Sequence, residues 1–212
     1  SQIDDEWRRN RKKVRDYCTH DAELALDILL ESNMMFDARF MAEKALLPLE
    51  FCVLPKQSWL LDSLLIRRFD AQGWAVPCMH WGTKVESKIK GAHVVQPEAG
   101  VYDWVFLLDF KAMYPSIIIS DNMCYTTHIK DDKFTSERVG LVPELMRELQ
   151  DERDQAKKEH KATGETYWDR IQWALKILSN AVYGLFTSAF YRFTNRYIGE
   201  SITSHARRNI RY

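Results

Sequence analysis

The stretch DFKAMYPSII, residues 109–118, gives the clearest indication of fold and function in this chain. It follows the apolar run VFLL, and the segment from Tyr102 to Phe110 is rich enough in aromatic and β-branched residues to predict a β-strand. Asp109 stands at the end of this strand, where burying a carboxylate is costly unless a cation or hydrogen-bond donors meet it. Two explanations stay open at this point. Asp109 caps the turn that follows, or it binds Mg²⁺, which prefers hard oxygen ligands.

Most of the remaining sequence is predicted to be helical. Leu141, Leu145 and Leu149 recur at intervals of four, and Pro143 suits a first turn, so a helix is expected to about residue 161. Thr163-Gly164 ends it, and a second helix over about 167–183 returns beside it as an antiparallel hairpin. Further helices are predicted over 4–31, over 58–69 with Ser58 as its N-cap, from about 114, and over about 197–211.

Two sets of polar residues recur at helical spacing. Lys176, Asn180 and Tyr183, preceded by Gln172, would share one face of the second hairpin helix. Arg153 and Lys157 lie four residues apart on the first. Either set could be an ordinary solvent-facing side of a helix, so spacing alone leaves binding and solvation both open.

Composition excludes some classes of protein but assigns no function. The 212 residues carry 30 basic and 30 acidic side chains, so overall charge does not indicate a nucleic-acid binder. The longest apolar runs fall far short of the roughly 20 residues that span a bilayer, so no membrane partner is expected. The first residues lack the pattern of a signal peptide. The four cysteines form no CxxC pair, which favours a reducing, intracellular location without a zinc site or disulfide framework.

DFKAMYPSII resembles the first palm motif of family B DNA polymerases, DFxSLYPSII, and PEAGVY at 97–102 matches the PxxGxY that precedes it in the family. The resemblance implies that Asp109 is catalytic and binds two Mg²⁺ ions, with the main chain of Phe110 at the metal. It also implies that Tyr114 lies under the incoming sugar and excludes ribonucleotides. Main-chain groups of Ala112 and Met113, which replace Ser and Leu of the motif, would meet the triphosphate.

A second match supplies the expected nucleotide grip. QWALKILSNAVYG, residues 172–184, resembles the polymerase motif Kx3NSxYG. The resemblance implies that Lys176 reaches the triphosphate and protonates the departing pyrophosphate, and that Asn180 shapes the pocket. Tyr183 would line the minor-groove side of the new base pair, with Gly184 beside the DNA. The finger-helix pattern RxxxK matches Arg153 and Lys157, which would hold the β- and γ-phosphates.

Two shorter matches lie earlier in the chain. Tyr17 and Asp21 fit Yx3D, the third motif of the 3′–5′ exonuclease domain, in which the Asp binds metal and the Tyr orients water. The other exonuclease acids would precede residue 1, so no proofreading is expected. IKGA at 89–92 stands where the family has YxGG or YxGA, a hinge that touches the template. Gly91 and Ala92 keep that pattern, whereas Ile89 replaces its tyrosine.

The resemblance implies a helix-rich α+β fold: part of a palm sheet, an antiparallel two-helix fingers hairpin and a remnant exonuclease helix. The expected divisions are an exonuclease remnant (1–45), a connecting segment with N-terminal palm (46–104), palm with the first motif (105–139), fingers (140–190) and a returning palm helix (191–212). No DTD motif and no thumb segment occur in the sequence. The chain alone is therefore expected to be inactive, because two-metal phosphoryl transfer needs the second carboxylate group.

The expected partners are primer-template DNA, a deoxynucleoside triphosphate (dNTP), the remaining palm and thumb on the same chain or a second subunit and, for the whole enzyme, a sliding clamp. The location would be cytoplasmic in an archaeon or bacterium and nuclear in a eukaryote. Two alternatives stay open. One is a non-catalytic nucleotide- or DNA-binding subunit derived from a polymerase, and the other is a purely structural helical protein.

Overall fold

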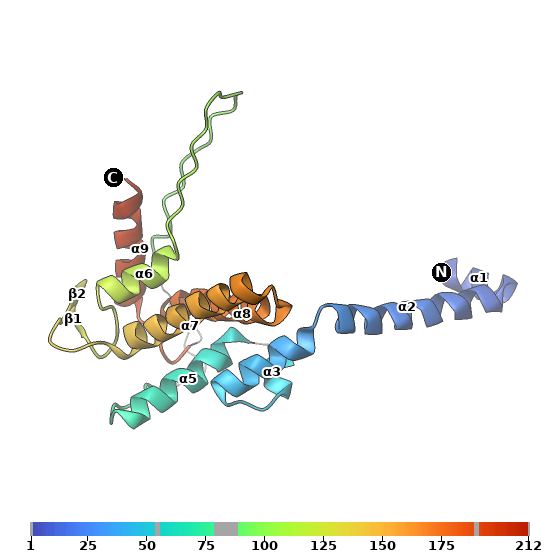
Figure 1. Ribbon diagram of the computed structural model, residues 1–212, viewed down its shortest axis with the longest axis horizontal. Helices are drawn as coiled ribbons and strands as arrows, with labels where there is room; N and C mark the ends of the chain where they lie inside the picture. The colour runs from blue at the N-terminus through green and yellow to red at the C-terminus, as the bar shows by residue number, and fades with distance from the viewer. Residues whose placement is uncertain (1, 54–55, 79–88, 189–190, 212) are drawn as a thin grey trace.

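A computed structural model describes residues 2–53, 56–78, 89–188 and 191–211. The described residues are mostly helical and contain one sheet of two short antiparallel strands, which confirms the expected helix-rich α+β class (Figure 1). The elements, in chain order, are α1 (Gln2–Arg9), α2 (Arg11–Glu31), α3 (Met34–Ala45), α4 (Glu50–Val53), α5 (Gln57–Ala71), α6 (Met113–Ser120), β1 (His128–Lys130), β2 (Lys133–Phe134), α7 (Leu141–Thr163), α8 (Thr166–Thr187) and α9 (Arg196–Ile210).

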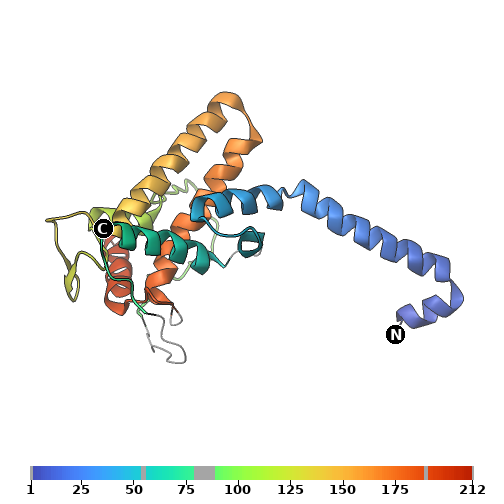
Figure 2. The ribbon, with the colours of Figure 1, turned by 90° about the horizontal axis from the view of Figure 1, so that it is seen from below.

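The hairpin of α7 and α8 is the largest unit, and its prediction is confirmed (Figure 2). Leu141, Leu145 and Leu149 are all buried, and each such leucine stabilises the fold by about 1.5–3 kcal/mol. Pro143 lies in the first turn of α7, where its missing N–H costs no intrahelical bond. Gly164 ends α7 in the left-handed conformation, at φ +71°, and donates its N–H to the carbonyl of His160.

Helix α8 runs through the core of the molecule. Its buried face packs against α3, α5, α6 and α9, so segments from both halves of the sequence surround it. Phe186 near its C-terminus is fully buried and joins an aromatic cluster with Tyr125, Phe69 and Phe193, whose ring centroids lie 5.4–6.5 Å apart. This cluster fixes the C-terminal end of α8.

The loop between α6 and α7 sets where α7 begins. Asn122, in the left-handed conformation at φ +54°, donates to the carbonyls of Thr135 and Arg138 at 2.8 Å each and accepts the Gly140 N–H at 2.9 Å. Gly140 precedes α7, and a Cβ there would lie 2.6 Å from the Cβ of Cys124, so a larger residue does not fit.

The N-terminal helix predicted over 4–31 is interrupted. Asn10 separates α1 from α2 and caps α2 by accepting the Lys13 N–H at 3.1 Å, a side-chain bond that competes with helix continuation. No residue of α2 is buried, and the helix projects from the body (Figures 1 and 2). The cap predicted for the fifth helix is also wrong: Ser58 lies inside α5, and Lys56 precedes its first residue.

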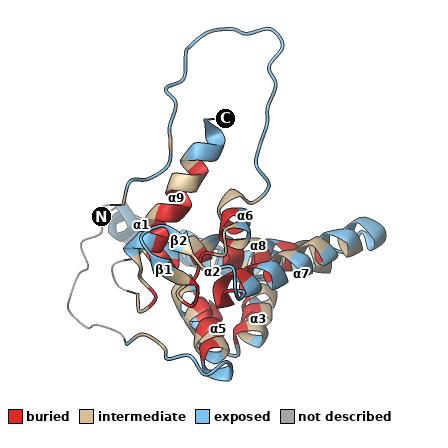
Figure 3. Cartoon of the chain, turned by 90° about the vertical axis from the view of Figure 1, so that its left-hand side faces the viewer, coloured by how far each residue is buried: buried red, intermediate tan, exposed pale blue. Residues whose placement is uncertain are grey.

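The strand predicted from Tyr102 to Phe110 is wrong. Residues 91–111 form an extended, exposed loop with no strand assigned, and Leu107 and Leu108 are 92% and 94% exposed (Figure 3). A strand needs a hydrogen-bonded neighbour, and no described residue pairs with this segment. The sheet of the described residues is therefore the β1–β2 pair, and Tyr102 to Phe110 add no strand to it.

Within the described ranges, no helix is long and apolar enough to cross a membrane. All four cysteines are described and free, with Cys52 and Cys124 buried and Cys18 and Cys78 exposed.

Candidate functional site: a cationic and aromatic surface at the base of the hairpin

Tyr114 and Tyr183 are brought together where the first turn of α6 meets α8. Their ring centroids lie 4.6 Å apart, with the planes inclined at 38°, a favourable geometry for an aromatic pair. Burial, followed by the neighbouring Tyr114, raises the pKa of Tyr183, whereas Arg207 acts in the opposite direction. Tyr183 thus keeps its phenolic proton and can donate a hydrogen bond.

Cationic side chains gather on the hairpin that also carries Tyr183. Arg153 and Lys157 lie one turn apart on α7, and Lys176 lies on α8. Partial burial lowers the pKa of Lys157, and the charges of Arg153, Lys111 and Lys176 lower it further, while Asp154 opposes them. Such influence requires the charges to be close. The hairpin therefore brings together the three cations predicted for phosphate, with Lys111 as a fourth.

Lys111 was not predicted as a site residue, although it lies inside the DFKAMYPSII motif. Its ammonium group donates to Asp154 Oδ2 at 2.7 Å and so joins the segment before α6 to α7. The hydrogen bond from Lys111 is the largest influence on the pKa of Asp154 and lowers it; burial opposes this, and the charges of Lys111, Lys157 and Arg153 lower the pKa further. The Asp154 carboxylate is therefore a counter-charge within the cationic group.

A tight turn places the motif at the start of α6. Ala112 adopts the left-handed conformation at φ +48°, which is uncommon for a residue other than glycine and is characteristic of functional sites. The turn is closed by Ser116, whose N–H donates to the carbonyl of Ala112 at 2.9 Å and whose hydroxyl donates to that of Lys111 at 3.1 Å. Met113 packs against the core at the start of the helix, while Phe110 is half-exposed.

Asp109 is exposed on the loop that leads into this turn. Its carboxylate and the carbonyl of Phe110 are hard oxygen donors of the kind that Mg²⁺ prefers. However, the described residues contain no group of three or more His, Cys, Asp or Glu side chains that could hold a metal. The residues described here supply only part of a ligand set and do not by themselves fit two metal ions.

The predicted stripe on α8 is only partly exposed to solvent. The ammonium group of Lys176 lies 4.1 Å from the ring centroid of Trp173, so an aromatic face restricts the lysine. Asn180 and Gly184 are exposed, and outside their own helix nothing lies within 4 Å of where a Gly184 Cβ would stand. Gln172 is instead buried and donates to Asp169 Oδ1 at 3.0 Å, so it does not belong to the same surface.

The segment predicted to touch DNA is held by α9. Arg207 donates to the carbonyls of Lys90 and Gly91 at 2.7 Å each, and the Thr203 hydroxyl donates to Lys90 at 3.0 Å. Ala92 follows, exposed. The charge of Arg207 also acts on the pKa of Tyr183, in the direction opposite to the larger effect of burial. Arg207 therefore lies close to both segments predicted to contact DNA, Gly91-Ala92 and Tyr183-Gly184. Arg207 was not predicted as a site residue, since its role depends on contacts with residues more than a hundred positions away.

The predicted exonuclease pair lies apart from this surface, on the projecting helix α2 (Figure 2). Hydrogen bonding to Asp21, and then the charge of that carboxylate, raise the pKa of Tyr17, so the two side chains lie close together on α2. Tyr17 is 60% exposed.

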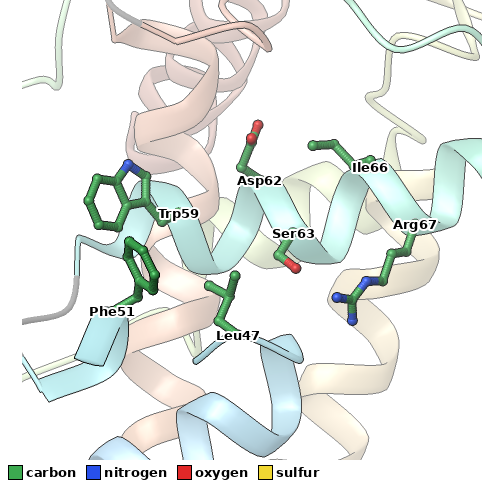
Figure 4. A pocket seen from close by; sticks show the side chains of 7 residues that line it. All are labelled: Leu47, Phe51, Trp59, Asp62, Ser63, Ile66 and Arg67. Atoms are coloured by element: carbon green, nitrogen blue, oxygen red, sulfur yellow. The ribbon is translucent and has the colours of Figure 1, made fainter. Parts of the chain in front are cut away.

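A pocket of about 390 Å³ on α5 and the preceding segment contains none of the predicted site residues (Figure 4). Its aromatic wall is the edge-to-face pair of Phe51 and Trp59, whose ring centroids lie 5.0 Å apart. Ser63 donates to the carbonyl of Ala45 at 2.6 Å, and Arg67 donates to that of Leu46 at 2.9 Å. These polar groups are used within the fold, and the pocket takes no part in the cationic site.

Comparison with known proteins agrees with the motifs. The model of the family described as DNA polymerase family B matches residues 47–137 and 130–212. DNA polymerase delta catalytic subunits are similar over 95% of the chain: that of Bos taurus is 30% identical over 228 residues, and that of Caenorhabditis elegans is 27% identical over 224. The chain spans only about a fifth of these relatives, 20% and 21% of their lengths.

A solved structure shares the fold. The family B DNA polymerase from the hyperthermophilic archaeon Pyrobaculum calidifontis aligns with a TM-score of 0.66 and 24% identity, over 88% of this chain and 26% of that one. The family model covers well over half of the sequence, including the segments that form the cationic and aromatic site. This chain therefore belongs to DNA polymerase family B.

Proposed function

We propose that this chain is the part of a DNA-directed DNA polymerase that grips the incoming dNTP during template-directed transfer of a nucleotide to a primer 3′-hydroxyl. The observation that carries the proposal is the convergence of Arg153, Lys157 and Lys176 on the hairpin whose second helix also carries Tyr183, the aromatic partner of Tyr114. Cations suit the triphosphate, because charge-assisted hydrogen bonds to phosphate are the stronger kind. The aromatic pair suits the sugar and base, because each tyrosine offers an apolar ring face for packing and a phenolic hydroxyl for hydrogen bonding.

The individual residues would act as follows. Arg153 and Lys157 would hold the terminal phosphates, and Lys176 would both contact the triphosphate and supply a proton to departing pyrophosphate. Tyr114 would lie under the sugar and exclude a 2′-hydroxyl. The phenolic hydroxyl of Tyr183 would donate a hydrogen bond to the acceptor atoms that every base pair presents in the minor groove.

The backbone and small residues complete the proposed site. Main-chain groups of Phe110, Ala112 and Met113 would meet metal and phosphate, a role that the tight turn at Ala112 supports. Asn180 would shape the pocket. The DNA would pass Gly184, Gly91 and Ala92, which leave room for a close approach at exposed positions.

Mg²⁺, when bound, would neutralise charge at the reacting phosphate, with Asp109 and the Phe110 carbonyl as two of its oxygen donors. The described residues do not complete that ligand set, so we expect no primer extension from these 212 residues alone. The division of the chain into exonuclease remnant, palm and fingers stays a prediction, as do the metal-binding role of Asp21, the contact with a sliding clamp and the intracellular location.

The test is binding of dATP and of inorganic tripolyphosphate, followed by Trp fluorescence, since Trp173 lies against Lys176. We expect Arg153→Ala and Lys157→Ala each to weaken binding about tenfold to a hundredfold, the loss typical of one hydrogen bond to a charged group. Lys12→Ala, which removes an exposed cation from the projecting helix α2, is the matched control and should bind as the unaltered chain does. Equal affinities for all four proteins would refute the proposed nucleotide grip, and primer extension by the chain alone would refute its predicted inactivity.

A further inference from the structure

The ion pair between Lys111 and Asp154 is poorly suited to a purely structural role. The side chains are 73% and 41% exposed, with 2.7 Å between the Lys111 Nζ and the Asp154 Oδ2. Water and dissolved salt screen charges this exposed, and an exposed pair contributes little to folding. The pair can therefore open at low cost, and either partner is free to exchange for a stronger ligand.

The surroundings of the pair attract negative charge. Lys111 and Asp154 line a small pocket of about 70 Å³ together with Arg153, Gln150, Ala112 and Ser116. Within the described ranges, Gln150 Nε2 and Arg153 Nε are buried without a hydrogen-bond partner, so donors as well as charges remain unsatisfied at this place. Glu152, the neighbouring acid, is engaged elsewhere by Lys44. The Asp154 carboxylate thus stands where several donors and cations converge.

We propose that Lys111 is a fourth phosphate-binding residue of the nucleotide site, and that Asp154 is a built-in counter-anion which Lys111 leaves when a triphosphate binds. The inference rests on the proposed function and extends it beyond Arg153, Lys157 and Lys176 to a further cation, Lys111, and to the carboxylate that competes for it, Asp154. A lysine has three N–H donors, and Asp154 uses one of those of Lys111. A triphosphate offers more charge and more acceptor oxygens than one carboxylate, so it wins the exchange.

The competing explanation is that Lys111 acts only by neutralising Asp154. A double-mutant cycle separates the two, with the affinity for inorganic tripolyphosphate as the measured quantity. We expect Lys111→Ala to weaken binding about fivefold, the effect of losing one screened charge-assisted bond, and Lys111→Arg to restore most of it. Asp154→Asn should tighten binding severalfold, because it removes the competing charge. The decisive variant is the double substitution: a directly bound Lys111 must still matter when residue 154 is Asn.

Each outcome decides the proposal. A fivefold loss from Lys111→Ala that persists in the Asp154→Asn background supports it. A loss that vanishes in that background, or no loss at all, overturns it, while a continued loss from Arg153→Ala leaves the proposed function intact. If the unaltered chain binds tripolyphosphate no better than Arg153→Ala does, both the proposed function and this inference fail. Lys12→Ala and Asp27→Asn on α2 control for net charge, and far-UV circular dichroism establishes that each variant is folded.

Discussion

Replacing Asn122 should destabilise the protein more than replacing any exposed site residue does, because this side chain sets the start of the α7–α8 hairpin. It makes two donor bonds at 2.8 Å and accepts one at 2.9 Å, all to backbone groups of residues 135–140. At about 1 kcal/mol for each net hydrogen bond, Asn122→Ala loses about 3 kcal/mol. Alanine also tolerates φ +54° less well than asparagine, which adds a smaller cost. Since the site is only partly buried, water recovers some of this, and we expect a loss of about 2–4 kcal/mol.

The measurement is urea unfolding followed by circular dichroism, with the midpoint expected to fall and the slope to stay constant. Asn122→Gly separates the two causes, since glycine loses the same side-chain bonds but accepts the left-handed backbone; it should be about 1 kcal/mol more stable than the alanine variant. Without the Asn122 side chain the first residues of α7 are held less firmly. Asn122→Ala should therefore also weaken tripolyphosphate binding, because Arg153 and Lys157 lie on that helix. A loss below about 0.5 kcal/mol for Asn122→Ala, within the range of ordinary surface substitutions, would refute the reasoning.

Three further outcomes are expected. Arg207→Ala should speed tryptic cleavage after Lys90 severalfold, because Arg207 holds the carbonyls of Lys90 and Gly91; unchanged cleavage would contradict this. Gly164→Ala should lower the free energy of unfolding in urea by about 1 kcal/mol, because φ is +71° there. Nothing lies near the added Cβ, so the backbone conformation is the only source of this cost. The lowered pKa of Asp154 contributes stability that is present above its ordinary value of 3.8 and is lost as pH falls through the lowered value. Because the pair with Lys111 is exposed, Asp154→Asn should lose only slightly less stability on acidification below about pH 4, and a large difference between the acid-unfolding curves would contradict the low cost of opening this pair.

Of the fold, the sequence predicted what depends on neighbours along the chain. Leucines four residues apart, the proline of the first turn and Gly164 are local signals, and they were sufficient for the hairpin. The residues matched to the polymerase motifs were also identified from the sequence, and the structure brings Arg153, Lys157 and Lys176 together as expected.

What the sequence could not decide depends on partners far along the chain. The strand expected from Tyr102 to Phe110 has the right composition, yet a strand forms only against another strand, and the described residues offer it none. Lys111 and Asp154 are 43 positions apart, and Arg207 and Gly91 are 116 apart. Their contacts exist because α7 and α9 pack back onto the segments beside them. The sequence by itself therefore determined the motif residues for which a role is proposed, whereas only tertiary packing decided which charges meet, because contacts at that separation leave no periodic pattern to be read.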